Sequence, residues 1–310
     1  MFDSPLSASA YEVLGVAADA PDEDLRRAYR LRLRATHPDT GGEAAVFIQV
    51  QRAWELVGAP DRRAAYDRGH GFADDAVSAD AWHAPDVRAD TRPRAKSYGE
   101  AGAQRRRLFV AEVTKWAGTE VADPYAPAFV RTVPRALRRL LADALAGERT
   151  ARTIADLGMG FTAWHDVATS SAASGSGSEA TDKLDHIVLG PSGLYGLTSA
   201  DLGGIARFRG GEIIGPDPDA PAPITALLGR IRTVARAAGV RFTGGILVLP
   251  DEDLYPATSP LGTIRGTPVV VVRQSALRPL LREGFPGART IGGTEVFDLR
   301  TRIRHAVRFA

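Results

Sequence analysis

The sequence predicts a multidomain protein in which an α-helical N-terminal domain is joined by a linker to a layered α/β C-terminal domain. The first 69 residues show only helical periodicity. From about residue 146 onward, strand patterns alternate with helix patterns. The length of 310 residues is also typical of two hydrophobic cores rather than one.

The composition limits the classes of function. Hydrophobic residues make up 44% and charged residues 25% of the chain, which is typical of globular domains with sizeable cores. The formal net charge of +2 gives no overall basic field for binding nucleic acid or anionic membranes. The absence of cysteine excludes disulfides, thiolate zinc sites and cysteine nucleophiles, and it suits a reducing compartment.

The sequence shows no targeting or membrane signal. Its first residues lack a basic segment followed by an apolar stretch. The longest aliphatic run, at 268–272, is too short to cross a bilayer. We therefore expect a cytoplasmic protein with no membrane span.

An antiparallel pair of helices is predicted near the N-terminus. The first should run over 22–36, because acidic residues follow Pro21 and complement the positive end of the helix dipole. Pro38 should end it, because a proline disfavours helical backbone at the preceding residue. Two glycines then allow the chain to reverse, and apolar residues at helical spacing over 43–58 predict the returning helix. The bend between the helices should therefore be exposed.

Four segments of residues 1–69 carry a resemblance to a known family. AYEVLGV, the basic helix, HPD and DRRAAYDRG occur in the order and at the spacings of the J-domain of DnaJ-type co-chaperones. The resemblance implies that this domain docks on a DnaK-type ATPase chaperone and stimulates its ATP hydrolysis. The residues that it implicates in partner binding are His37, Pro38, Asp39, Arg26, Tyr29 and Arg30.

Elementary chemistry supports these roles. Arg26 and Arg30 are four residues apart, so they share a helix face that can meet an acidic surface. Asp39 offers a carboxylate for a bidentate arginine contact on the partner. For isolated residues the simpler interpretation is a solvated basic face and an aspartate that caps the next helix. Within the complete module we favour partner binding.

One position departs from the family pattern. Arg32 stands where the family usually has leucine, between Leu31 and Leu33. Either the helix is slightly rotated, or the Arg32 stem lies over the core with its charged end in water.

Residues 70–104 show neither helix nor strand periodicity, which predicts a flexible linker. It is not the Gly/Phe-rich linker of full-length DnaJ-type proteins, and no cysteine zinc module is available. The resemblance is therefore to reduced J-proteins that attach the J-domain to another domain.

Basic amphipathic helices are predicted over 105–145. Arg105 to Arg107 open a helix over 105–118, which we expect to pack through its apolar residues, with an interfacial membrane helix as the alternative. A second helix, over about 126–147, carries a row of arginines. These are Arg131, Arg135, Arg138 and Arg139. Such a row can bind the phosphates of nucleic acid, but a solvated face is favoured because no aromatic residues are interleaved.

The C-terminal domain, residues 146–310, is predicted from alternating patterns. Its expected elements are a helix over 147–158, a strand over 161–167, a flexible turn over 169–182, two strands over 183–200, a helix over 223–240, strands over 243–250 and 267–273, a helix over 275–284, a strand over 294–299 and a helix over 300–309. The two aliphatic strands lack period-two alternation, which predicts burial on both faces.

This domain resembles the nuclease-related domain NERD, a branch of the PD-(D/E)xK nuclease superfamily. The resemblance covers roughly 146–250 and depends mostly on the stretch LDHIVLGPSGLYGL. It implies a restriction-endonuclease-like layered fold in which a helix glutamate, a strand aspartate and an acidic-x-lysine pair surround a divalent metal. Glu148 and Asp185 match the first two positions, whereas the third motif falls on Thr198-Ser199-Ala200 and is lost.

The lost groups could have migrated, because Lys183 points to the same side of a strand as Asp185, and Asp201 lies one place beyond the lost pair. That alternative gives a metal-dependent nuclease, using Mg²⁺ on DNA or RNA, with a regulatory J-domain. We favour a catalytically silent domain with no metal and no other cofactor, which selects a client or localises a co-chaperone. The six histidines show no metal-ligand spacing, and no Walker, GxGxxG or GxSxG motif is present.

Overall fold

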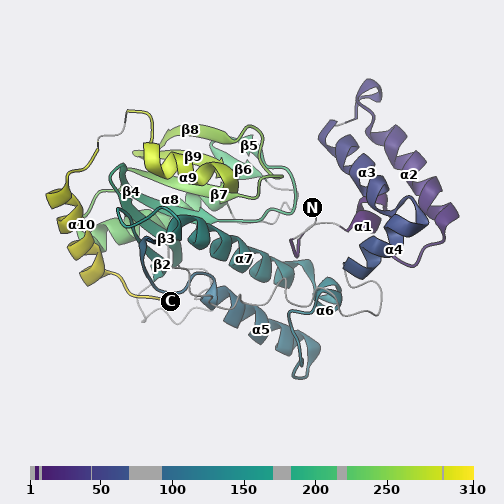
Figure 1. Ribbon diagram of the computed structural model, residues 1–310, viewed down its shortest axis with the longest axis horizontal. Helices are drawn as coiled ribbons and strands as arrows, with labels where there is room; N and C mark the ends of the chain where they lie inside the picture. Colours follow the sequence, from purple (N-terminus) through teal and green to yellow (C-terminus); the bar gives the residue numbers. More distant parts are fainter. Residues whose placement is uncertain are drawn as a thin grey trace. The chain divides into compact units, whose positions relative to one another are not determined.

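The computed structural model describes residues 4–6, 9–42, 44–69, 93–169, 183–214, 222–287 and 290–310 (Figure 1). Most of the predicted linker, 70–92, and nearly all of the predicted turn, 170–182, lie outside the described residues. The chain divides into two compact units. The first comprises Met1–Val87 with Thr119–Arg138, and the second comprises Arg88–Gly118 with Arg139–Ala310.

The first unit contains a small helical domain. Its helices are α1 (Ala10–Leu14), α2 (Asp22–Thr36), α3 (Ala44–Val57) and α4 (Pro60–Gly69), with a 3₁₀ turn at Pro38–Thr40. The bounds of α2 confirm the predicted helix over 22–36. Ser9 and Glu12 form a reciprocal capping box at the start of α1. The helices enclose one apolar core, made of Ala10, Tyr11, Leu14, Leu25, Val50, Ala53, Val57 and Tyr66.

One arginine ties α4 to the other end of this domain. Arg63 Nη1 lies 2.5 Å from Asp22 Oδ1 at the start of α2, and its Nε donates to the Tyr11 hydroxyl at 3.1 Å. Its Nη2 donates to the carbonyl oxygens of Ala18 and Ala20 at 2.9 and 2.7 Å. Arg63 therefore fixes the connection between α1 and α2, whose carbonyl groups would otherwise lack these donors.

The departure at Arg32 is accommodated at the surface. Leu33 is half-buried against the core, while Leu31 is exposed. Arg32 is exposed as well, and its guanidinium lies beside Gly15, the left-handed residue that ends α1. The charged end of Arg32 thus stays at the surface, and Leu33 supplies the apolar contact.

The predicted basic helices have different bounds in the structure. Instead of one helix over 126–147 and another over 147–158, there are α6 (Pro127–Thr132) and α7 (Arg135–Ala155). The break falls at Val133, whose backbone is extended because Pro134 follows it. Arg131 is therefore on a different helix from the other three arginines, and the prediction of one continuous row is wrong.

Those arginines are not on a fully solvated face either. All four are half-buried. Burial lowers the pKa of Arg131 and of Arg138, and Arg138 Nη1 donates to the Pro5 carbonyl oxygen at 3.3 Å.

The second unit is built on a mixed sheet of seven strands in the order β1-β2-β3-β4-β7-β9-β8 (Figure 1). The strands are β1 (Lys96–Tyr98), β2 (Thr162–Ala168), β3 (Lys183–Gly190), β4 (Gly193–Ser199), β7 (Gly244–Leu249), β8 (Thr258–Ile264) and β9 (Thr267–Arg273). The pairs β2–β3, β3–β4 and β8–β9 are antiparallel, whereas β1–β2, β4–β7 and β7–β9 are parallel. A separate hairpin joins β5 (Arg207–Arg209) and β6 (Glu212–Ile214).

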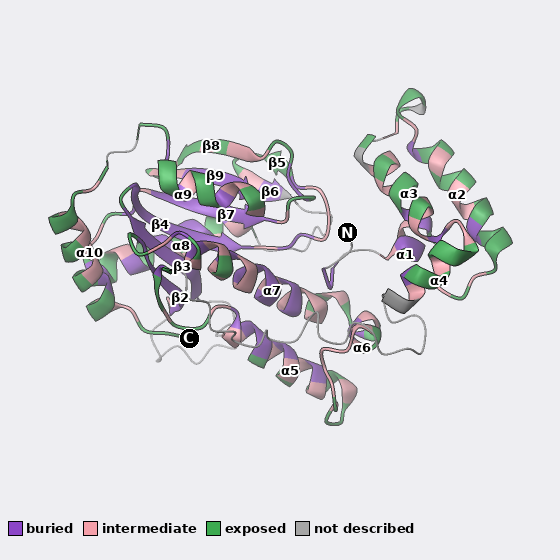
Figure 2. Cartoon of the chain, viewed as in Figure 1, coloured by how far each residue is buried: buried purple, intermediate pink, exposed green. Residues whose placement is uncertain are grey.

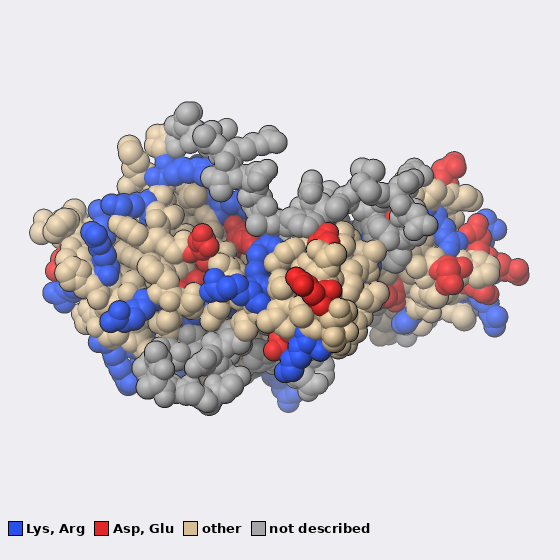
Figure 3. All heavy atoms as spheres, turned by 90° about the horizontal axis from the view of Figure 1, so that it is seen from below, with Lys and Arg blue, Asp and Glu red and all other residues tan. Residues whose placement is uncertain are grey.

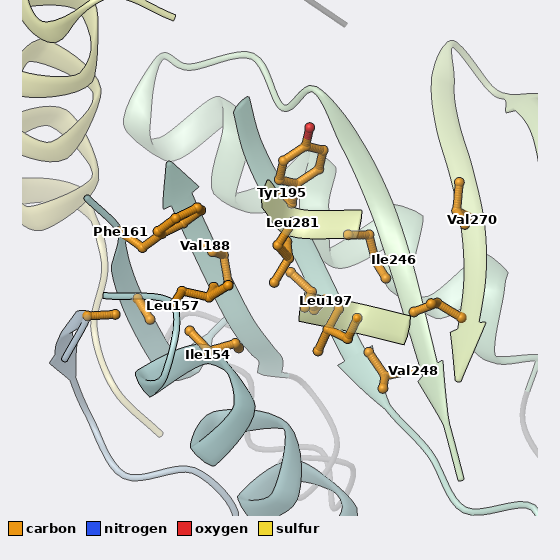
Figure 4. Packing of buried hydrophobic residues seen from close by; sticks show 14 of the residues in the cluster. Ile154, Leu157, Phe161, Val188, Tyr195, Leu197, Ile246, Val248, Val270 and Leu281 are labelled. Atoms are coloured by element: carbon orange, nitrogen blue, oxygen red, sulfur yellow. The ribbon is translucent and has the colours of Figure 1, made fainter. Parts of the chain in front are cut away.

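Helices cover both faces of this sheet, which gives three layers (Figure 2). The apolar residues of α7 and α9 (Leu277–Glu283) pack on one face, and those of α8 (Pro223–Ala238) and α10 (Gly293–Ala306) pack on the other. Figure 4 shows the first face, where Ile154 of α7 and Leu281 of α9 lie among the strand side chains.

The two aliphatic strands are buried on both faces, as their lack of alternation predicts. On β9, Val270 and Val272 belong to the core under α7 and α9, whereas Val269 and Val271 belong to the core under α8. All six residues of β7 are buried.

Four parts of the second unit differ from the sequence prediction, and one of them is the hairpin of β5 and β6, which was not predicted. The stretch 93–104 is not an unstructured linker, because β1 forms there and α5 (Ala103–Ala117) begins at its end. The stretch 294–299 is not a strand but the first half of α10. The edge strand β8 was not predicted, and its Pro260 and the register shift beside it explain the weak strand signal.

Candidate functional site

The bend between α2 and α3 has a compact backbone of its own. His37 ends α2 in extended conformation, and Asp39 N–H donates to His37 Nδ1 at 3.2 Å. Gly41 adopts a left-handed conformation with φ of 84°, and its N–H donates to the Pro38 carbonyl oxygen. Gly42 N–H donates to the His37 carbonyl oxygen at 2.9 Å. The proline and the glycines thus hold the bend in one turn.

The three residues of the tip differ in exposure. Pro38 and Asp39 are exposed, and the Asp39 side chain is 88% accessible. The His37 ring is half-buried and meets Phe47 of α3 edge to face, with ring centroids 5.0 Å apart. Since Nδ1 accepts a hydrogen bond, a neutral His37 carries its proton on Nε2. Each of the three residues therefore offers a defined group to a partner at the surface.

On α2, Arg26 and Arg30 are both exposed, one helical turn apart. Tyr29 lies between them in sequence but is half-buried, and its ring stacks on Trp54 with centroids 4.4 Å apart. The structure thus presents the two arginines to solvent and uses Tyr29 partly as a packing residue.

In the second unit, Asp185 is surrounded by cationic and amide donors. Arg105 Nη1 lies 2.7 Å from its Oδ1, and Lys183 Nζ lies 3.5 Å from the same oxygen. Ser199 N–H donates to its Oδ2 at 3.1 Å. Burial alone would raise the pKa of Asp185, but Arg105 and Lys183 hold it well below its usual range. Asp185 is therefore an ionised carboxylate whose two oxygens are both engaged.

A neighbouring aspartate connects this group to α5. Asp166 accepts from Gly102 N–H at 3.3 Å and from Gln104 N–H at 3.4 Å, so it caps the N-terminus of α5. Lys183 Nζ also pairs with Asp166 Oδ1. Asp166 stands in β2 with a φ of 49°, a conformation that aspartate tolerates better than most residues.

Glu148, on α7, pairs with a different arginine of α5. Both of its carboxylate oxygens pair with Arg106, with Oε2 at 2.9 Å from Nη2. The structure therefore does not bring Glu148 and Asp185 to a shared cation, but gives each carboxylate its own arginine from α5. Each carboxylate is thus neutralised by a guanidinium group and not by a shared metal.

The residues at and next to the lost acidic-x-lysine motif do not restore a metal site. Ser199 Oγ donates to Thr150 Oγ1 at 2.9 Å and lies 3.3 Å from His186 Nε2, so it belongs to a row of buried polar groups. Asp201 N–H donates to Asp143 Oδ1 at 3.3 Å. Within the described ranges, no group of three carboxylate or imidazole side chains has an arrangement that could hold a metal ion. The residues present thus do not fit the divalent metal that a nuclease of this kind requires.

Sequence reasoning missed the arginines of α5 as site residues. Arg105 and Arg106 were expected only to open a helix that packs through its apolar residues, yet they are themselves only 8% and 9% exposed. A signal was present, because Arg105 shares a helix face with Phe109 and Val113 at spacings of four. Asp166 had no such signal, since its partners come from distant segments.

Basic side chains are scattered rather than gathered into a continuous track on the face that Figure 3 shows. Lys and Arg are interspersed with Asp and Glu there. None of the described helices combines the length and the apolar character needed to cross a membrane.

Comparison with known proteins identifies the helical domain. The family model of the DnaJ domain matches residues 9–67. The chain is 46% identical over 61 residues to the chaperone protein DnaJ of Cyanothece sp., which is 19% of this chain and 16% of that protein. It is 43% identical over 58 residues to DnaJ protein homolog 2 of Allium porrum, covering 19% and 14%, and 45% identical over 69 residues to the chaperone protein DnaJ of Bordetella bronchiseptica, covering 21% and 18%.

The chain thus spans less than a fifth of the length of these relatives. No solved structure matches it significantly. The match to the family model agrees with the four helices and with the exposed bend between α2 and α3. Residues 9–67 of this chain therefore form a J-domain of the DnaJ type.

Proposed function

We propose that this protein is a co-chaperone whose J-domain binds a DnaK-type ATPase chaperone and stimulates its ATP hydrolysis. The observation that supports this most directly is the bend between α2 and α3, which holds Pro38 and Asp39 outward in a turn fixed by its own backbone hydrogen bonds. Asp39 can accept a bidentate arginine contact from the partner.

The basic face of α2 adds an electrostatic contribution. Arg26 and Arg30 are exposed on one side of the helix, so they can speed encounter with an acidic surface and lose this effect at high salt. We propose that these two arginines, together with His37, Pro38 and Asp39, contact the partner, and that Tyr29 supports them through its stack on Trp54.

Single-turnover ATP hydrolysis by a DnaK-type chaperone tests the proposal. The full chain should raise the hydrolysis rate, and Asp39→Asn or His37→Gln should abolish the rise, because each removes one group of the bend, the exposed carboxylate or the half-buried imidazole. Asp61→Asn, at an exposed position of α4, is the matched control and should stimulate like the wild type. Equal stimulation by wild type and Asp39→Asn would refute the proposal.

We also propose that the C-terminal domain is a nuclease-like scaffold of the NERD type without catalytic activity, which selects a client or localises the J-domain. The order of α7, β2, β3, β4, α8 and β7 supports the resemblance. The pairing of Asp185 with Arg105, and of Glu148 with Arg106, supports the inactive state. Divalent-metal-dependent cleavage of DNA or RNA that disappears in Asp185→Ala would instead establish the nuclease. A cytoplasmic location, which the lack of cysteine favours, belongs to the same proposal.

A further inference from the structure

The outer surface of α8 and α10 is strongly basic. The stretches 223–249 and 291–310 together carry eight arginines against two carboxylates, Glu295 and Asp298, an excess of +6 in a chain whose formal net charge is only +2. Six of these arginines are exposed, and we call the surface that they form the basic face. They are Arg232, Arg236, Arg241, Arg302, Arg304 and Arg308. Positive charge is therefore concentrated here and not spread evenly over the chain.

The two helices lie in one layer over the sheet. Val234 of α8 and Ile303 of α10 belong to the same apolar cluster beneath this layer. Arg302 Nη1 donates to the carbonyl oxygen of Gly239, the residue that ends α8, at 3.2 Å. The basic face therefore continues from one helix to the other.

Most of this charge has no counter-charge within the protein. Arg302 pairs with Asp298 at 2.9 Å. The side chains of the other five arginines make no hydrogen bond or ion pair with any residue that the structure describes. Arg232 and Arg236 are one turn apart on α8, so they extend from the same side of the helix. Five guanidinium groups are thus available to an anionic partner.

An exposed aromatic ring stands among these arginines. Phe297 is 67% exposed, and Arg304 follows it two helical turns later on the same side of α10. The centre of a protein interface is apolar and poor in charge, which does not fit this surface. The backbone of a nucleic acid duplex offers phosphates but no apolar place for the ring. A phospholipid surface offers both, because its phosphates lie directly above an apolar boundary.

We propose that the basic face docks the C-terminal domain on an anionic phospholipid surface. The arginines contact lipid phosphates, and Phe297 enters the boundary between head groups and acyl chains. Clusters of about four to eight basic residues on amphipathic helices bind anionic lipids in this way. The inference rests on the localising role proposed for the C-terminal domain and names its target. It requires no activity of the J-domain.

Co-sedimentation of the full chain with phospholipid vesicles tests the proposal. One set of vesicles contains phosphatidylcholine alone, and the other contains equal amounts of phosphatidylcholine and phosphatidylglycerol. The chain should bind the anionic vesicles and not the neutral ones. Raising the salt from about 0.1 to about 1 M should release most of it, because the Debye length falls from about 10 to about 3 Å.

Three variants make the test specific. Arg232→Gln with Arg236→Gln should lower the partition coefficient at least about tenfold, since one basic residue near an anionic surface contributes about fivefold. Arg278→Gln with Arg282→Gln is the matched control, because it removes two exposed arginines from α9, on the other face of the sheet, and it should bind like the wild type. Phe297→Ala should lower the coefficient several-fold and leave its salt dependence unchanged, because the ring is apolar.

Three results would overturn the proposal. The wild type could show no preference for the anionic vesicles, which needs no substitution and decides the matter even if a variant does not fold. The α8 and α9 variants could lose binding equally. The chain could bind duplex DNA through the two arginines of α8 and bind no vesicles, which would assign the basic face to nucleic acid. Stimulation of ATP hydrolysis, measured without vesicles, should be unchanged in the α8 variant, so failure of the co-chaperone proposal remains distinguishable.

Discussion

His165 and His186 face each other across the β2–β3 ladder, with their Nδ1 atoms 2.8 Å apart in the interior of the sheet. They are 4% and 0% exposed. One ring must donate and the other accept, so the accepting ring cannot gain a second proton without breaking this contact. Burial, with Lys183 nearby, lowers the pKa of His165 to about 4, and burial, with His165 nearby, lowers the pKa of His186 well below its usual value.

This pair should make folding sensitive to acid. In the unfolded chain both histidines titrate near their ordinary pKa of about 6.5. Between that pH and about 4, the unfolded state therefore binds more protons than the folded state, so the contribution to stability falls as the pH falls. We expect a loss of roughly 2–4 kcal/mol between pH 7 and pH 5, measured by urea unfolding.

The variant that checks this assignment carries His165→Asn and His186→Asn. Its free energy of unfolding should change less between pH 7 and pH 5 than that of the wild type, because asparagine does not titrate. Carboxylates contribute to the pH dependence of both proteins, so the difference between the two curves isolates the histidines. Parallel curves would contradict the prediction.

Asp253 should have the opposite pH dependence. It is 4% exposed, its Oδ2 has no hydrogen-bond partner, and burial together with Asp201 raises its pKa to about 8. Between its unfolded pKa of about 3.9 and about pH 8, the folded state holds a proton that the unfolded state has lost, so the contribution of Asp253 to stability falls as the pH rises.

Asp253→Asn imitates the protonated form and keeps an oxygen for the amides of Leu202 and Gly204. It should therefore stabilise the protein by roughly 4–5 kcal/mol at pH 8.5 and by only about 1–2 kcal/mol at pH 5. Asp251→Asn, at an exposed position of the same turn, is the control. An equal effect of Asp253→Asn at both pH values would show that Asp253 is not the titrating group.

Arg63 should be a main support of the J-domain. Its guanidinium makes contacts with Asp22, with the Tyr11 hydroxyl and with two carbonyl groups between α1 and α2. Arg63→Ala should cost roughly 2–4 kcal/mol, because several buried or half-buried partners lose their donors together. Arg62→Ala removes an exposed neighbour that makes one bond to a carbonyl group and should cost less than about 1 kcal/mol. Hydrogen exchange of the backbone amides of α1–α4 in the full chain measures both, because it reports on this domain alone.

The J-domain could be predicted because its determinants are local. Helical spacing, Pro38 and the two glycines lie within the segment that they shape, and the bounds of α2 follow from them directly. The burial of β7 and β9 was also predictable, since a strand without alternation has no solvent face.

The buried charges of the second unit depend on long-range pairing and could not be predicted. Arg105 reaches Asp185 across 80 residues of sequence, and β1 pairs with β2 across a similar span. A three-residue strand such as β1 has too few positions for periodicity to show. The segment 294–299 forms a helix and not the predicted strand. The spacing of its apolar residues is compatible with a helical period as well as with the alternation of a strand.

Lys183 provides a final prediction, because it is 1% exposed and stands between two carboxylates. Its Nζ pairs with Asp166 and lies 3.5 Å from Asp185. Lys183→Met fills a similar volume but leaves one buried carboxylate short of its cation, so unfolding should require roughly 3–5 kcal/mol less free energy. Lys115→Met, at a side chain that is 79% exposed, should change stability by less than about 1 kcal/mol.

A double-mutant cycle with Asp166→Asn separates the pair from its surroundings. If Lys183 acts mainly by compensating Asp166, the double variant should be more stable than Lys183→Met alone, because the uncompensated charge has been removed along with its partner. Asparagine tolerates the positive φ of this position and can still accept from the first amides of α5, so the cap is kept. Additive losses in the double variant would mean that the two side chains contribute independently, and the compensation argument would then fail.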